Sequence, residues 1–170
     1  SHKLQGGTLL YASWGTGYEA DVAPNNPFYV NRGQVQPALR SQQVELGIKG
    51  GFDHSEWSLA AFDIERPVSA AFGTCDAEDS CTWARDGNAV HRGVEATLAA
   101  RLGAWNVAGG AMALQARRED SADASLNGLR PTNVPAYTLK LQLGYRVAEL
   151  PGLELLANGL YESDRIVMPD

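Results

Sequence analysis

The sequence has no apolar run long enough to form a transmembrane helix. Its two longest stretches without a charged side chain are residues 4–18 and 102–116, fifteen residues each. A helix that crosses a bilayer needs about 20 mostly apolar residues, and both stretches are interrupted by glycines and polar groups. Transmembrane helices are therefore excluded.

Basic residues are also scarce. The 170-residue chain has 14 Lys plus Arg against 20 Asp plus Glu, which gives a net charge of −6, and the basic residues form no cluster. Nucleic acid is therefore not an expected partner. Hydrophobic residues make up 44% of the chain and charged residues 20%, so the chain is not a disordered acidic tail. Its length is ordinary for one domain.

The sequence carries no recognisable catalytic or metal-binding motif. His2, His54 and His91 are scattered, and no pair has the spacing of metal ligands. The glycines of Gly15–Gly17 lack the helix that a phosphate-binding loop requires. We therefore predict that the protein is not an enzyme and has no metal or cofactor of its own.

Glycine and the two cysteines point to a β-structure outside the cytosol. Glycine accounts for 18 of the 170 residues, and in β-proteins glycines mark turns, bulges and crowded positions. Cys75 and Cys81 lie close together in a polar stretch, which suits a small disulfide loop in an oxidising compartment. Two free thiols in a cytosolic loop remain the alternative.

Apolar and polar residues alternate through most of the sequence. In Tyr137–Val147 the odd positions are apolar or aromatic, whereas the even positions are mostly polar. Side chains at i and i+2 share one face of a strand, so such a segment has one apolar and one polar face. The pattern predicts an all-β antiparallel meander of about seven long strands, at residues 8–17, 41–51, 57–66, 90–101, 105–117, 137–147 and 153–163.

The predicted connections alternate between long and short. The long ones are residues 18–40, 67–89 and 118–136, and the short ones are 52–56, 102–104 and 148–152. Strands of 10 to 13 residues exceed the usual length in soluble sheets and suit a tilted crossing of a bilayer. Transmembrane β-barrels have short periplasmic turns and long extracellular loops. The sequence therefore favours part of a transmembrane β-barrel over a soluble sandwich.

Five segments, in order along the chain, resemble barrel motifs of TonB-dependent siderophore receptors. They cover most of residues 8–163 and are Leu9–Tyr18 (LLYASWGTGY), Ser41–Gly50 (SQQVELGIKG), Leu59–Arg66 (LAAFDIER), His91–Leu98 (HRGVEATL) and Leu129–Pro135 (LRPTNVP) followed by Tyr137–Val147. Each motif alone is weak, but their order and spacing are similar to those of the family.

The resemblance implies that residues 1–170 are a single fragment of a barrel in the bacterial outer membrane. The family's plug domain, which contacts TonB, and its remaining strands have no counterpart in this sequence. The parent protein would import ferric siderophores, in which the small molecule chelates the iron. Besides the siderophore, the expected partners are outer-membrane lipid and, through the absent N-terminal plug, TonB. The isolated fragment should self-associate or close into a smaller barrel, because unpaired strand edges and an apolar face are left exposed.

Arginines and aromatic residues of the long loops are the candidates for ligand binding. Ferric siderophores are often aromatic and anionic, so such side chains would suit them. The candidates are Tyr18, Phe28, Tyr29, Arg32, Trp83, Arg85, Arg118 and Arg130, with Arg40 as a further arginine of the first loop.

Two other functions remain open. One is a small outer-membrane barrel with a structural or adhesive role, which would need an eighth strand and closure of the sheet. The other is a soluble barrel that binds a small ligand, in which Leu139, Leu141 and Leu143 would face an enclosed apolar interior.

Overall fold

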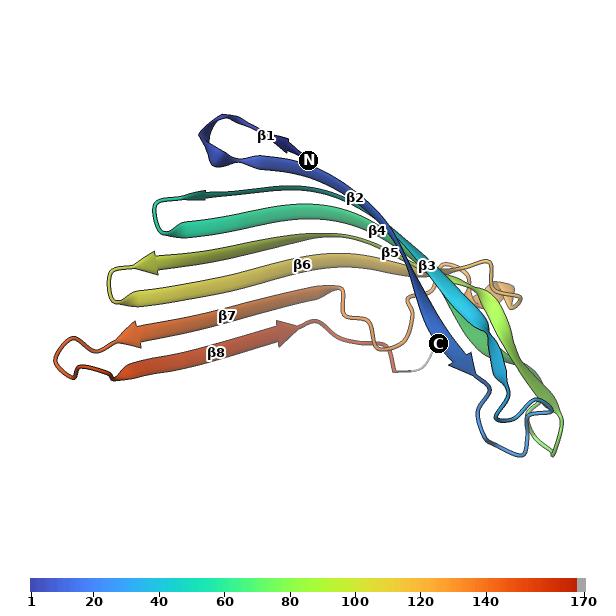
Figure 1. Cartoon of the computed structure of the whole chain (residues 1–170). Helices are drawn as coiled ribbons and strands as arrows, with labels where there is room; N and C mark the ends of the chain where they lie inside the picture. The colour runs from blue at the N-terminus through green and yellow to red at the C-terminus, as the bar shows by residue number, and fades with distance from the viewer. Residues whose placement is uncertain (168–170) are drawn as a thin grey trace.

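The computed structural model describes residues 1–167 and shows one open, curved antiparallel sheet (Figure 1). Each strand pairs with the next along the chain, in the order β1 to β8. No helix of the described chain is long and apolar enough to cross a membrane. The strands are β1 (His2–Lys3), β2 (Leu9–Val22), β3 (Val35–Phe52), β4 (Ser55–Gly73), β5 (Cys81–Leu102), β6 (Trp105–Glu119), β7 (Tyr137–Arg146) and β8 (Glu154–Glu162), with 3₁₀ turns at Gln5–Gly7 and Ala124–Leu126.

The predicted all-β meander is confirmed, and each of the seven predicted strands is present as β2 to β8. The eighth, β1, was not predicted and has two residues. The predicted bounds of β6, β7 and β8 are within two residues of those observed, whereas β2 to β5 are longer than predicted. Their additional residues mix apolar and polar side chains without a clear alternation in the sequence, although they pair in ladders that contain one irregularity each in β2–β3 and β4–β5.

The connections alternate in length, but two of the predicted long loops are shorter than expected. The predicted loop 67–89 is mostly strand, and only residues 74–80 connect β4 with β5. Likewise, the predicted loop 18–40 is reduced to residues 23–34. Residues 120–136 remain as the third connection at this end, and the short turns lie together at the opposite end (Figure 1). We call the two ends the long-loop end and the short-turn end.

One side of the sheet is apolar for about nine residues from the short-turn end, and we call it the apolar face. The strand registers place on it residues such as Leu46, Leu59, Leu98 and Leu141. Leu46 is 61% exposed and Leu141 is 48% exposed. Leu139 and Leu141 are thus not enclosed in an interior, contrary to what a soluble ligand-binding barrel requires. The apolar face further includes Leu10, Trp14, Val44, Ile48, Trp57, Val94, Val107, Leu139, Leu143 and Leu155.

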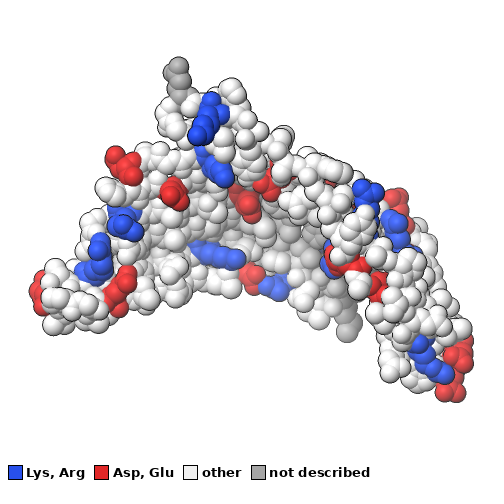
Figure 2. Space-filling view, viewed as in Figure 1, with Lys and Arg blue, Asp and Glu red and all other residues white. Residues whose placement is uncertain are grey.

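The opposite side, which we call the polar face, carries charges along its whole length. Over the same distance from the short-turn end its charged residues are Glu45, Lys49, Glu56, Glu95, Arg101, Lys140, Arg146, Glu154 and Glu162. In the space-filling view of Figure 2, charges of both signs are interspersed and form no large patch of one sign. A face with this composition suits a water-filled lumen, whereas the apolar face suits lipid.

Tyr11 lies across the polar face and depends on a glycine opposite it. Tyr11 and Gly47 are partners in the β2–β3 ladder. A Cβ atom at position 47 would lie 2.3 Å from the Tyr11 ring. Glycine is therefore required at this position for the ring to lie flat over the neighbouring strand.

The closely packed part of the protein lies at the long-loop end. The buried hydrophobic residues of the described chain include Ala23, Cys81, Ala89, Val90 and Ala116. All five belong to the loops or to the strand segments near them. Because the sheet does not close, β8 on one side and most of β2 on the other are unpaired edges (Figure 1).

The two faces should respond differently to an added charge. Replacing Leu141→Arg should lower the free energy of unfolding in lipid bilayers by about 2–4 kcal/mol, because a guanidinium on the lipid side is costly near the bilayer centre. Gln142→Arg, at the next position but on the polar face, is the matched control and should change it little. Equal losses for the two variants, measured by denaturant titration, would show that the faces are assigned wrongly.

Candidate ligand-binding site at the long-loop end

Two strand hairpins separate at the long-loop end. The β3–β4 ladder stops at the pair Gln42 and Glu65. The β2–β3 ladder continues beyond it to Val22 and Val35, and the β4–β5 ladder continues to Gly73. The region between them is therefore held by side chains and loops instead of by a common ladder, and it is the candidate binding region.

Acidic residues of β2 connect the two hairpins. Asp21 accepts a hydrogen bond from the Ser69 hydroxyl at 2.5 Å and another from the Trp83 indole Nε1 at 3.0 Å. Two residues earlier in β2, Glu19 forms an ion pair with Arg66 through two hydrogen bonds. In one of them Arg66 Nε lies 2.7 Å from Glu19 Oε1. The Arg66 guanidinium lowers the pKa of the Glu19 carboxyl. The hairpins are thus fastened at successive positions of β2.

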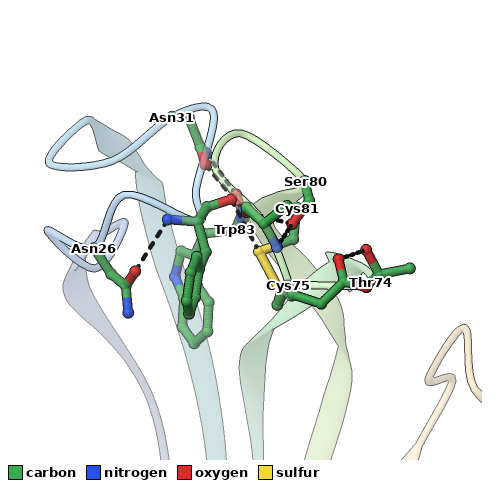
Figure 3. Close-up of a disulfide and its surroundings, with 10 residues drawn as sticks. Asn26, Asn31, Thr74, Cys75, Ser80, Cys81 and Trp83 are labelled. Atoms are coloured by element: carbon green, nitrogen blue, oxygen red, sulfur yellow. Dashed lines mark hydrogen bonds between the residues drawn. A yellow bond between two sulfur atoms is a disulfide. The ribbon is translucent and has the colours of Figure 1, made fainter.

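The loop at residues 23–34 docks on the disulfide at the tip of the β4–β5 hairpin (Figure 3). The structure joins Cys75 to Cys81, which agrees with the disulfide suggested by the sequence. The Cys81 amide donates to the Phe28 carbonyl at 3.0 Å, and the Cys81 carbonyl accepts from the Val30 amide at 2.9 Å. Cys81 is 2% exposed, so the docked loop covers one end of the disulfide.

Trp83 is held on several sides by this loop. The Asn31 side chain donates to the Trp83 carbonyl at 2.8 Å and accepts from the Trp83 amide at 2.9 Å. The Tyr29 ring packs edge-on against the Trp83 indole, with ring centres 6.0 Å apart. Together with the bond to Asp21, these contacts fix the position of the indole.

A buried carboxylate anchors the third loop. Asp86 is 4% exposed and accepts hydrogen bonds from Arg118 Nη2 at 2.7 Å, the Ser121 hydroxyl at 2.8 Å and the Ala122 amide at 2.8 Å. Gly87 follows in the left-handed region at φ 68°, and a Cβ there would lie 2.3 Å from the Glu119 carbonyl oxygen. The β5 backbone can therefore turn Asp86 toward the start of loop 120–136 only with glycine at position 87.

The contacts of Asp86 favour its ionised form. Burial alone would raise its pKa, but the bonds from Ala122 and Ser121 and the charge of Arg118 outweigh it, so the pKa lies below its ordinary value. Arg118 Nε is buried without a hydrogen-bond partner among residues 1–167. The guanidinium of Arg118 therefore depends on Asp86 for its main contact.

Four of the predicted site residues lie in strands, not in loops. Tyr18 belongs to β2, Trp83 and Arg85 to β5, and Arg118 to β6. Tyr18 shares the face of Leu10 and Trp14, so its side chain does not line the region between the hairpins. Trp83 and Arg118 are occupied by the structural contacts described above. Arg40 also lies in a strand: it belongs to β3 and is the ladder partner of Tyr18 in β2.

The other four predicted residues lie in loops, as expected, and Arg85 stays exposed in its strand. Phe28 is 37% exposed, and Tyr29 packs on Trp83. Arg32 lies 3.9 Å from Asp79, with both side chains exposed. Arg85 is an exposed residue of β5 that donates to Asn88 at 3.0 Å. In loop 120–136, Arg130 forms an ion pair with Asp164 at 2.8 Å.

The sequence did not single out Asp21, Asn31 or Asp86. Asp21 falls in the loop predicted at residues 18–40, where a lone aspartate or asparagine indicates only a turn. Asp86 precedes Gly87, an Asp-Gly pair that is typical of a turn. Only the hydrogen bonds of the folded chain show that both carboxylates point toward other segments.

A comparison with protein families decides the assignment. Residues 2–166 match the family model described as TonB dependent receptor-like, beta-barrel. The chain belongs to this family. TonB-dependent receptors are β-barrel proteins of the bacterial outer membrane, so the apolar face of this TonB-dependent receptor chain is the side that faces lipid.

Solved receptors have a similar fold. The ferric preacinetobactin receptor BauA from Acinetobacter baumannii matches with a TM-score of 0.65 at 23% identity, over 91% of this chain and 23% of that chain. The P. aeruginosa protein FpvA, solved with bound ferric pyoverdine, matches with 0.68 at 20% identity, over 95% and 21%. The alcaligin outer-membrane receptor FauA from Bordetella pertussis matches with 0.64 at 19% identity, over 95% and 28%.

The TonB-dependent receptor chain therefore spans about a quarter of the length of these receptors. No curated protein matches the chain. The short-turn end corresponds to the periplasmic side of such barrels and the long-loop end to the extracellular side.

Removing the charge of Asp86 should release loop 120–136. Asp86→Asn should lower the free energy of unfolding by about 2 kcal/mol at neutral pH. The hydrogen bonds to a charged group are lost, and Arg118 is left without its charged partner. The measurement is amide hydrogen exchange at Ala122, which should become faster. Asp120→Asn, at an exposed neighbouring aspartate, is the control.

The pH dependence of this effect follows from the lowered pKa. Asp86 stabilises the folded state while it is ionised, so its contribution is present at neutral pH and is lost as the pH falls through its folded pKa. The difference between the wild type and Asp86→Asn should therefore shrink below the ordinary carboxyl range. A difference that is the same at all pH values would contradict the ionic role of Asp86.

Reducing the disulfide should loosen the loop at residues 23–34. Reduction of the disulfide between Cys75 and Cys81 should lower the free energy of unfolding by about 2 kcal/mol, because the unfolded chain gains conformational entropy. Amide exchange at Val30 should become faster, because this amide donates to Cys81. A Cys75→Ala/Cys81→Ala variant should not respond to the reductant. Unchanged exchange at Val30 in the reduced wild type would show that the loop docks independently of the disulfide.

Proposed function

We propose that this chain is a fragment of an outer-membrane receptor that imports ferric siderophores. The observation that carries the proposal is the match of residues 2–166 to the barrel family. The apolar face and the long-loop end of the sheet agree with it. The proteins of similar fold named above include receptors for ferric preacinetobactin, ferric pyoverdine and alcaligin. Import would need the complete barrel, its plug domain and TonB, which would act through that plug.

The ligand would meet the protein at the long-loop end. Arg32 and Arg85 are exposed there. Arg32 Nη1 lies 3.9 Å from Asp79 and donates to the Pro27 carbonyl at 3.2 Å, and Arg85 donates to Asn88 at 3.0 Å. Among residues 1–167 neither guanidinium has a close carboxylate partner. Guanidinium groups bind anionic oxygens by charge-assisted hydrogen bonds, and Phe28 adds an exposed ring nearby in sequence. The iron would be held by the siderophore, with no ligand from the protein.

The remaining predicted residues would support the site indirectly. Trp83, Tyr29 and Arg118 hold the loops in place, and Arg130 would be available only after separation from Asp164. Tyr18 would lie at the lipid boundary, since aromatic residues are enriched at both membrane interfaces. An adhesive or purely structural small barrel is not favoured, because the sheet of residues 1–167 has no closing pair between its edges.

The proposal predicts that exposed arginines of the loop end contribute to affinity. In the intact receptor, Arg32→Ala/Arg85→Ala should weaken binding of the ferric siderophore at least tenfold, since each charge-assisted bond is worth about 1.5–3 kcal/mol. The measurement is a titration of the ligand by intrinsic fluorescence. The control is Arg92→Ala, which removes an exposed arginine on the outward side, where it pairs with Asp63. Unchanged affinity in the double variant would remove these residues from the site.

A further inference from the structure

Aromatic residues mark the upper edge of the lipid-facing side of the sheet. On that side, the outermost aromatic residues of β2, β7 and β8 are Tyr18, Tyr137 and Tyr161. The ladders place Tyr161 on one row with Leu10 of β2, so Tyr18 lies eight residues closer to the long loops than Tyr161 does. Tyr137, one strand away from Tyr161, lies two residues closer. The line through the three tyrosines, which we call the long-loop line, therefore crosses the sheet obliquely.

A second pair of aromatic residues gives the same slope at the short-turn end. Trp57 of β4 is on one row with Leu141 of β7, and Tyr145 lies four residues closer to the short turns. Four residues over three strands equal eight residues over six. With a rise of about 3.3 Å per residue and about 4.8 Å between strands, this slope corresponds to a strand tilt of about 40°. Barrel strands have such a tilt, and aromatic residues line both membrane interfaces, so the two lines mark the two edges of the bilayer's apolar layer.

The long-loop line crosses β5 at Arg92. The strand β5 is three strands from β8, so the line there lies four residues beyond the row of Tyr161, which contains Ala96, and reaches Arg92. In β6, Gln115 is the ladder partner of Arg92, and Arg117 lies two residues closer to the loops on the same side. Gln115 and Arg117 are therefore just outside the apolar layer, at the depth of the lipid headgroups.

These side chains have donors that the protein does not use. Arg92 donates to Asp63 through Nε at 2.7 Å, and among residues 1–167 its terminal nitrogens have no partner. Arg117 is exposed, and the same part of the chain provides no ion pair or side-chain hydrogen bond for it, whereas Glu119 beyond it is half-buried. Arg92 and Arg117 are diagonal neighbours on adjacent strands, about 7–8 Å apart. Two guanidinium groups beside the Gln115 amide suit a phosphate group.

An open apolar groove leads from these donors into the apolar layer. Within one row, the small residues Ala61 and Ala113 lie between Leu46 and Tyr137 and leave the face hollowed. The end of the groove toward the long loops is formed by Asp63, Arg92 and Gln115. The groove therefore suits an acyl chain whose headgroup lies at the donors.

We propose that this groove binds lipopolysaccharide, the phosphorylated lipid of the outer leaflet, with an acyl chain over Ala61 and Ala113 and a phosphate at Arg92, Gln115 and Arg117. The long-loop end corresponds to the extracellular side, so the lipid that meets it belongs to the outer leaflet. The phosphate charge is opposite to that of the two guanidinium groups. This proposal concerns the lipid side of the sheet and does not depend on siderophore import.

Native mass spectrometry of the intact receptor in detergent micelles, titrated with lipopolysaccharide, tests the site. Arg117→Gln should weaken the binding about tenfold, because one charge-assisted hydrogen bond to a phosphate is lost. Arg101→Gln is the matched control. It removes an exposed arginine on the polar face near the short turns and should leave the affinity for lipopolysaccharide unchanged.

Two further probes test the part of the lipid that is recognised. Lipopolysaccharide dephosphorylated with a phosphatase should bind the wild type at least tenfold more weakly, and phosphatidylglycerol should also bind more weakly than lipopolysaccharide. The proposal is overturned if Arg117→Gln binds lipopolysaccharide as tightly as the wild type, if Arg101→Gln loses as much affinity, or if phosphatidylglycerol binds equally well. The dephosphorylated probe needs only the wild type, so equal binding of both forms overturns the proposal even where Arg117→Gln does not fold.

Discussion

The pairing of backbone groups within the sheet is the constraint on which the rest of this structure depends. In a bilayer no water is available for an exposed N–H or C=O, so each strand needs a neighbour on both sides. The meander from β2 to β8 meets this requirement for its inner strands and leaves it unmet at the two edges. The same constraint explains why the lipid side can be apolar while charges such as Lys49 and Lys140 occupy the other face.

Beyond the bilayer, the same strands follow different rules. Water can satisfy backbone and side-chain groups there, so the two hairpins are free to separate after the pair Gln42 and Glu65. In this region hydrogen bonds to carboxylates connect the segments in place of ladder hydrogen bonds: Asp21 connects the hairpins, and Asp86 holds the third loop. Arg118, a candidate ligand-binding residue from the sequence, contacts Asp86 here and helps to hold the third loop.

The accuracy of the sequence-based predictions follows this division. The segment Tyr137–Val147 was predicted almost to the residue, because one face meets lipid and the other meets water. The segment 81–89 was missed as a strand, since both of its faces are polar or covered and no period of two remains. The disulfide could be suggested because Cys75 and Cys81 are close in sequence, whereas the bond between Asp21 and Trp83 joins residues far apart in the chain.

By itself, the sequence determined the fold class, the two faces of the sheet and the family, because the period of two and the order of the barrel motifs are local properties of the chain. Only the tertiary structure decided which polar groups remain free. That depends on where separate segments meet: Trp83 is held by Asp21 and Asn31, and Arg118 is held by Asp86, whereas Arg85 stays exposed. The ladder register and the docking of loops place these groups, and neither can be read from the neighbours of a residue in the sequence.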